Sequence, residues 1–137
     1  MNAKEPRPIA RIPDCPRHLT GVARAEWTRI ARILFRLHVI TDLDRAALAA
    51  YCSAYADYVK ASNKLKTQGE VIKSAEGNGY QNPWTGIKKR SMDQMVKFGA
   101  EFGLTPSSRV RLRVDGTDVE EEKERNLFPN ANKVSKK

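Results

Sequence analysis

The sequence predicts a mainly α-helical protein, with three main helices, a short β-hairpin between the second and the third, a short C-terminal element and disordered ends. Three observations predict this fold. Apolar residues recur every three or four positions in three separate stretches, as they do on one face of a helix. Glycine-rich turn chemistry separates the second stretch from the third. Prolines or charged residues dominate the two ends, which therefore lack the apolar surface needed to fold alone.

The first helix is predicted over residues 19–40. Its apolar face is formed by residues spaced by four, three, four and three positions: Ala23, Trp27, Ile30, Leu34 and Leu37. Thr20 is a residue type that accepts a backbone hydrogen bond at a helix start, so we expect it to cap this helix.

The second helix is predicted from Thr41 to about Gln68, before Gly69. Thr41 and Asp44 have the spacing of a capping box, so Asp42 and Asp44 are interpreted as helix-start acids rather than as a catalytic pair. The residues along one side of this helix are Leu48, Tyr51, Tyr55, Tyr58, Ser62 and Leu65. The helix is long for so small a chain, which indicates that part of it packs against another subunit.

A short hairpin is predicted between this helix and the next. Val71 and Ile72 are β-branched, and the turn residues 76–79 follow them. One hairpin is marginal alone, so it needs support from the helices or from a neighbouring chain. The third helix is predicted from Pro83, with Asn82 as its cap, to Gly103. Its apolar face is Trp84, Ile87, Ser91, Met95, Phe98 and Phe102.

Beyond Gly103, a further element is predicted to begin with Thr105 as N-cap and Pro106 at the first helical position. Arginines then alternate with aliphatic residues. A strand places Arg109, Arg111 and Arg113 on one face, whereas in a helix only the first and the last share a face.

Charge and proline divide the chain into three parts. Residues 1–17 contain four prolines and are predicted to form a flexible arm. Residues 18–114 form the predicted helical domain. Residues 115–137 form a predicted mobile charged tail, in which 115–124 hold six acids and one lysine. The formal charge of +9 on 137 residues favours a polyanionic partner, of which nucleic acid is the usual one.

The sequence lacks the patterns of common active sites. It contains no phosphate-binding loop, no nucleophile–base signature and no cluster of metal ligands, and His18 and His38 lie far apart in the sequence. Two cysteines, Cys15 and Cys52, imply no disulfide framework. No apolar run approaches the ~20 residues of a membrane span. We therefore expect a cytosolic protein that is not an enzyme and has no cofactor, metal or membrane partner.

Three basic groups are candidates for DNA contact: Arg29, Arg32 and Arg36; Lys88, Lys89 and Arg90; and Arg109, Arg111 and Arg113. Each group is also compatible with a solvated face, but the net charge favours phosphate binding. The turn between the first two helices resembles a helix-turn-helix without the turn glycine. A dimeric helix-turn-helix transcription regulator is therefore the alternative function, and a small hydrolase is a third class.

Four segments in order resemble the phage terminase small subunit family: "LTGVARAEWTRIARIL", "ITDLDRAALAAYCSAYADY", the glycine-rich hairpin with "NPW", and "FGLTPSSRVRL". The resemblance covers about residues 16–114, and "GLTPSSR" is its most specific piece. It implies a mostly helical subunit of a ring that binds concatemeric viral DNA in the host cytoplasm. It also implies delivery of that DNA to a large subunit, which carries the ATPase and the nuclease.

Two expectations concern the C-terminal region in such a ring. The arginines at 109, 111 and 113 contact either DNA or acidic groups of an adjacent subunit, and the second is favoured because Val110 and Leu112 need burial. Leu127 and Phe128 are adjacent large apolar residues in a mostly polar tail. We expect these two residues to dock on the large terminase subunit.

Overall fold

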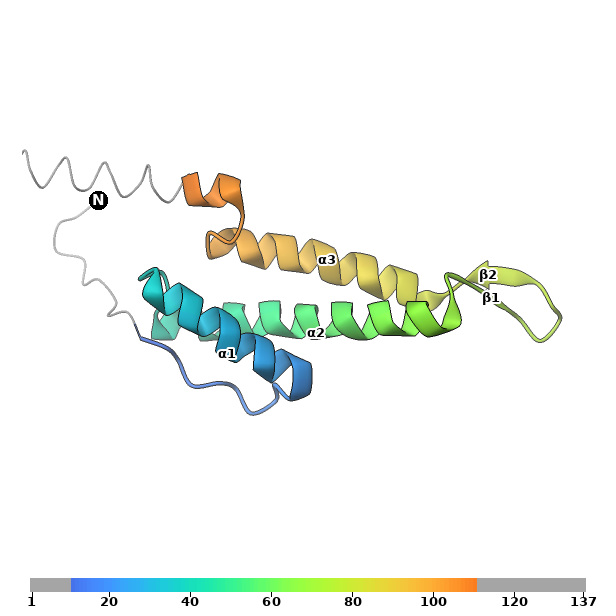
Figure 1. Ribbon diagram of the computed structural model, residues 1–137, viewed down its shortest axis with the longest axis horizontal. Coiled ribbons are helices and arrows are strands. Elements are labelled where there is room, and N and C mark those ends of the chain that lie inside the picture. Colours follow the sequence, from blue (N-terminus) through green and yellow to red (C-terminus); the bar gives the residue numbers. More distant parts are fainter. Residues whose placement is uncertain (1–10, 111–137) are drawn as a thin grey trace, which may run out of the picture. The chain divides into compact units, whose positions relative to one another are not determined.

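The computed structural model describes residues 11–110, which divide into two compact units, the first ending at Phe102 and the second beginning at Gly103 (Figure 1). The elements of the first unit are α1 (Gly21–Arg36), a 3₁₀ turn η1 (Asp42–Asp44), α2 (Arg45–Gln68), β1 (Val71–Lys73), β2 (Gly79–Gln81) and α3 (Pro83–Glu101). Three helices with a hairpin between the second and the third confirm the predicted fold class.

The main core lies between α1 and the N-terminal half of α2. Trp27, Ile30 and Leu34 of α1 are buried, as are Leu48 and Cys52 of α2. This part of the predicted apolar face of α1 is therefore confirmed. Burial of a side chain of this size stabilises a fold by about 1.5–3 kcal/mol, so this layer contributes substantially to the stability of the unit.

The predicted end of α1 is wrong. The helix ends at Arg36 rather than at residue 40, and Leu37 is 56% exposed instead of buried. The cause is His38, whose φ of 57° is left-handed. The Val39 amide donates to the Leu34 carbonyl and the His38 amide donates to the Phe35 carbonyl, which are the two hydrogen bonds of a Schellman motif. Glycine usually occupies the left-handed position, so its absence hid this helix end.

The two predicted helix starts differ in outcome. Thr20 occupies the N-cap position of α1, but its side chain makes no capping hydrogen bond, so that expectation is wrong. Gly21, the next residue, has a left-handed φ of 51°, which changes the path of the chain into the first turn. The capping box before α2 is confirmed: the Thr41 amide donates to Asp44 Oδ2 at 2.8 Å, and the Leu43 amide donates to Thr41 Oγ1 at 3.3 Å.

Helix α2 is the shared element of the unit, because it packs against α1 and against α3 (Figure 1). The α2–α3 contact includes small residues, with Ala61 and Ser91 buried. The predicted faces of both helices are confirmed, since each of their members is buried or half-buried. Between the helices, Lys60 Nζ lies 5.5 Å from the centroid of the Trp84 ring, a cation–π distance.

Strands β1 and β2 form an antiparallel pair in the register Val71–Gln81, Ile72–Tyr80 and Lys73–Gly79. In the turn between them, the Ser74 amide donates to the Asn78 carbonyl at 2.8 Å. The hairpin extends past the adjoining ends of α2 and α3 (Figure 1). Both strands are largely exposed, so the helices of the same chain give this hairpin little cover.

Buried Asn82 joins the hairpin to both long helices. Its Nδ2 donates to the Gly69 carbonyl at 2.9 Å and to Gln68 Oε1 at 3.2 Å, at the end of α2. Its Oδ1 accepts from the Trp84 amide at 3.1 Å and caps α3, as predicted. One side chain therefore fixes the end of α2 relative to the start of α3.

Substituting Asn82→Ala is expected to lower the free energy of unfolding by about 2 kcal/mol, because it removes a cap and leaves the Gly69 carbonyl without its donor. Urea unfolding followed by circular dichroism measures this change. Asn82→Asp keeps the capping oxygen and loses the amide donor, so it separates the two contributions. A loss below about 0.5 kcal/mol for the alanine variant would contradict this role.

In the second unit, Gly103 has a left-handed φ of 69°, and residues 106–110 are helical. Thr105 caps this helix through a reciprocal pair of bonds: the Ser108 amide donates to Thr105 Oγ1 and the Thr105 amide donates to Ser108 Oγ, each at 3.2 Å. The predicted cap is confirmed, with serine in the place that glutamate often takes. The strand alternative is wrong for residues 106–110.

Candidate nucleic-acid interface

The outer face of α1 carries exposed arginines. Arg32 and Arg36 are four residues apart and lie on the side of the helix opposite the buried Trp27, Ile30 and Leu34. Within residues 11–110, neither arginine forms an ion pair. Their guanidinium groups are therefore available for charge-assisted hydrogen bonds to phosphate.

Arg29, the third predicted member of this group, is already paired. Its Nε and Nη2 donate to the two carboxylate oxygens of Glu26 at 2.9 and 2.7 Å. The Glu26 side chain is only 3% exposed, whereas that of Arg29 is 57% exposed. The hydrogen bonds that Arg29 donates to Glu26 raise the pKa of Arg29, so the guanidinium stays charged, and the Glu26 carboxylate neutralises that charge. Arg29 is consequently a weaker candidate for DNA contact than Arg32 or Arg36.

The buried carboxylate of Glu26 also affects its neighbours on α2. Burial raises the pKa of the Cys52 thiol to about 12, and the charge of Glu26 adds to the shift. Burial likewise raises the pKa of Tyr51, with Glu26 again contributing. A thiol that stays protonated at neutral pH is a poor nucleophile, so Cys52 is a core residue rather than a reactive one.

The predicted basic group on α3 does not share one face. Lys88, Lys89 and Arg90 are consecutive, so their side chains leave the helix about 100° apart. Lys88 Nζ lies 5.9 Å from the centroid of the Tyr58 ring and so faces α2. Lys89 and Arg90 are exposed. The structure therefore leaves at most two of these three side chains free of α2, on different flanks of the helix.

Of the third predicted group, the structure describes Arg109 alone. Arg109 is exposed, and its Nη1 donates to the Leu104 carbonyl at 3.4 Å. Arg111 and Arg113 lie outside the described residues, as do Leu127 and Phe128.

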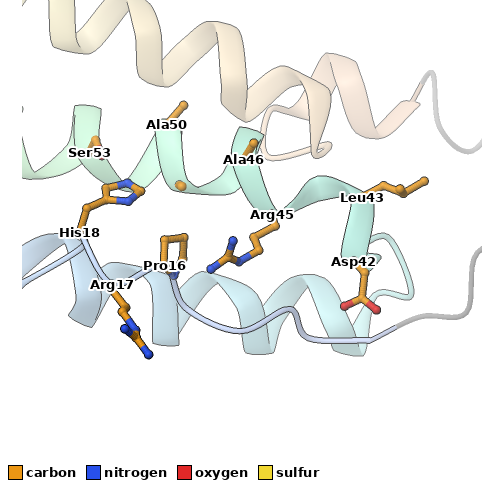
Figure 2. Close-up of a pocket in the computed structure, with 10 residues that line it drawn as sticks. Pro16, Arg17, His18, Asp42, Leu43, Arg45, Ala46, Ala50 and Ser53 are labelled. Atoms are coloured by element: carbon orange, nitrogen blue, oxygen red, sulfur yellow. The ribbon is translucent and has the colours of Figure 1, made fainter.

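Sequence reasoning missed a further basic cluster. Arg17, His18 and Arg45 line one open pocket, in which the segment before α1 runs beside the first turns of α2 (Figure 2). The segment is anchored, because Arg45 Nε donates to the Asp14 carbonyl at 2.8 Å and the Arg11 amide donates to the Ile40 carbonyl at 3.4 Å. No local pattern could reveal this cluster, because 28 positions separate Arg17 from Arg45.

Comparison with known families decides the family of the chain. The family model described as "Phage terminase, small subunit" matches residues 23–119, which is well over half of the chain. The chain belongs to the phage terminase small subunit family. The resemblance noted in the sequence is thereby confirmed. No curated protein and no solved structure matches the chain.

Membership of the terminase small subunit family supports a role in phage DNA packaging. The small subunit is generally the non-catalytic part of a terminase. In residues 11–110, no group of three or more His, Cys, Asp or Glu side chains is arranged to hold a metal ion. Across the same residues, no helix has the length and apolar character needed to span a membrane.

Proposed function

We propose that this terminase small subunit is a non-catalytic, DNA-binding ring that recognises concatemeric viral DNA and delivers it to the large terminase subunit in the host cytoplasm. The family match carries this proposal. Arg32 and Arg36 on the outer face of α1, which form no ion pair within residues 11–110, support duplex binding. The groups at Lys88–Arg90 and Arg109–Arg113 remain further candidates for DNA contact.

Exposed apolar side chains support self-association. Val71 and Val96 are 68% and 64% exposed, and Tyr80 and Met92 are each 48% exposed. These side chains lie on the hairpin and on α3, so one subunit presents apolar groups on separate elements. Different surfaces that meet between identical subunits give heterologous contacts, which close into a ring when the rotation permits.

Mass measurement by light scattering tests the ring. We expect a mass several times the 15.4 kDa of one chain, and ring-shaped particles in class averages from electron microscopy. A stable monomer at micromolar concentration in native mass spectrometry would rule the ring out. A dimer would instead favour the alternative function, a helix-turn-helix transcription regulator.

We further propose that residues 18–114 form the packaging and assembly domain, that 1–17 form an arm whose later residues are anchored by the bonds at Arg11 and Asp14, and that 115–137 form a tether to the large subunit. Leu127 and Phe128 are the proposed anchors, because they are apolar within a charged segment.

Deletion of residues 115–137 is expected to leave the number of subunits in the assembly unchanged and to weaken large-subunit binding at least tenfold, because it removes both proposed anchors. DNA affinity should stay equal or rise, since the deleted segment carries the acidic run. The double variant Leu127→Ala/Phe128→Ala removes the two proposed anchors but keeps the charge of the tail. It is therefore the matched control for the effect of the acidic run. Normal large-subunit binding by the deletion variant would disprove the tether.

A further inference from the structure

The pocket beside the start of α2 has the features of a phosphate-binding site. We call it the basic notch; its lining residues include Pro16, Arg17, His18, Asp42, Arg45, Ala46 and Ala50. Figure 2 shows His18 and Arg45 on either side of Pro16, with Ala46 and Ala50 on adjacent turns of α2 and Arg17 extending outward. Cationic side chains from two distant parts of the chain thus border one concave surface.

The notch is held in place by the backbone. Pro16 is buried, and its carbonyl accepts a hydrogen bond from the Leu19 amide at 3.1 Å. The bond from Arg45 Nε to the Asp14 carbonyl fixes the guanidinium and leaves its terminal nitrogens for another acceptor. Preorganised donors lose less conformational entropy when a ligand binds than free surface side chains do.

The charge of the notch favours an anion. Two arginines and one histidine line it, against a single carboxylate from Asp42, which lies 3.8 Å from Arg11 Nη1. Within residues 11–110, neither Arg17 nor Arg45 forms an ion pair. The other α2 residues that line it, Ala46, Ala49, Ala50 and Ser53, have small side chains, which let a bulky group approach the helix closely.

We propose that the basic notch binds a phosphodiester of the DNA backbone, as a contact point additional to the outer face of α1. Arg17 and Arg45 donate to phosphate oxygens, and the alanine wall accommodates the adjoining deoxyribose. An acidic peptide is the less suitable ligand, because alanines offer no deep hole for a large anchoring side chain. This inference rests on the proposed DNA binding.

Two variants test the notch by charge and by shape. Arg17→Glu reverses one exposed cation, and Ala46→Trp fills the notch from an exposed position on α2 without changing the charge. Each is expected to lower the affinity for a random-sequence DNA duplex about tenfold at low salt. Arg17→Glu should also reduce the slope of log K against log salt by about 1. Lys66→Glu is the matched control, an equal charge change on an exposed residue about 30 Å along α2.

The outcomes separate this inference from the proposed function. If the unmodified protein fails to bind the duplex, DNA binding itself is wrong and the notch with it. If that protein binds but Arg17→Glu matches Lys66→Glu, or Ala46→Trp and the smaller Ala46→Leu change nothing, the notch is not a site. Loss of large-subunit binding with intact DNA binding would assign the notch to a peptide and also overturn the proposal. Light scattering on every variant verifies that assembly is retained.

Discussion

Reversing Arg32 and Arg36 together to glutamate is expected to weaken duplex DNA binding by about a hundredfold at low salt. Both side chains are exposed and lie on one face of α1, so one DNA backbone can contact both. Each reversal removes a phosphate contact and adds repulsion. The slope of log K against log salt should fall by about 2, because about one counterion is released per contact. Fluorescence anisotropy across a salt series measures both quantities.

The control for this experiment is Lys64→Glu/Lys66→Glu, which changes the net charge equally on an exposed part of α2. Arg29 is left intact, because a glutamate there would face the buried carboxylate of Glu26 and disturb the fold. Unchanged affinity of the Arg32/Arg36 variant for DNA would show that the outer face of α1 is not a DNA-binding surface. Lys89, Arg90 and the arginines from Arg109 onward would then be the remaining predicted contacts.

Replacing Arg29 by alanine is expected to lower the free energy of unfolding by about 3 kcal/mol. The substitution removes both donors of the Glu26 carboxylate, which is almost completely buried. Leaving one member of a buried ion pair without its partner costs about 3–5 kcal/mol, and the exposure of Arg29 places the expected value at the lower end. Urea unfolding at a fixed protein concentration measures the loss, since assembly also contributes to apparent stability.

Replacing both partners of the ion pair identifies the cause of that loss. Glu26→Leu/Arg29→Leu removes the carboxylate together with its partner, so its stability should lie within about 1 kcal/mol of the unmodified protein. Arg24→Ala, at an exposed position on the same helix, controls for the loss of an arginine from the surface. If Arg29→Ala lowers the free energy of unfolding no more than Arg24→Ala does, burial of the Glu26 carboxylate does not depend on its bonds to Arg29.

The elements that could be predicted are those with their own local chemistry. Thr41 and Asp44 form the expected capping box, and Asn82 with Pro83 begins α3 as expected. The end of α1 could not be predicted, because a histidine takes the left-handed position that glycine normally marks. Similarly, Thr20 is a good capping residue by type, but the conformation of Gly21 leaves its hydroxyl unused.

The candidate site was less predictable, because function depends on which side chains remain unpaired. Glu26 lies three positions before Arg29, within a stretch that otherwise suggests a row of free arginines. Lys88, Lys89 and Arg90 are neighbours in sequence, but the helix directs them differently. Arg17 and Arg45 are far apart in sequence but line the same pocket, because the segment before α1 packs beside α2.

The hydrogen bonds around Asn82 hold the two ends of the hairpin together at the junction of α2 and α3. The Asn82 amide donates to the Glu70 carbonyl at 2.8 Å, and its side chain holds the Gly69 carbonyl, so the chain returns almost to the point where it left α2. Residues 71–81 can therefore change in length or sequence while α2 and α3 keep their register. Related phages could diversify this loop independently of the helices, and a fluorophore or affinity tag inserted at residues 76–78 should leave the helical framework intact.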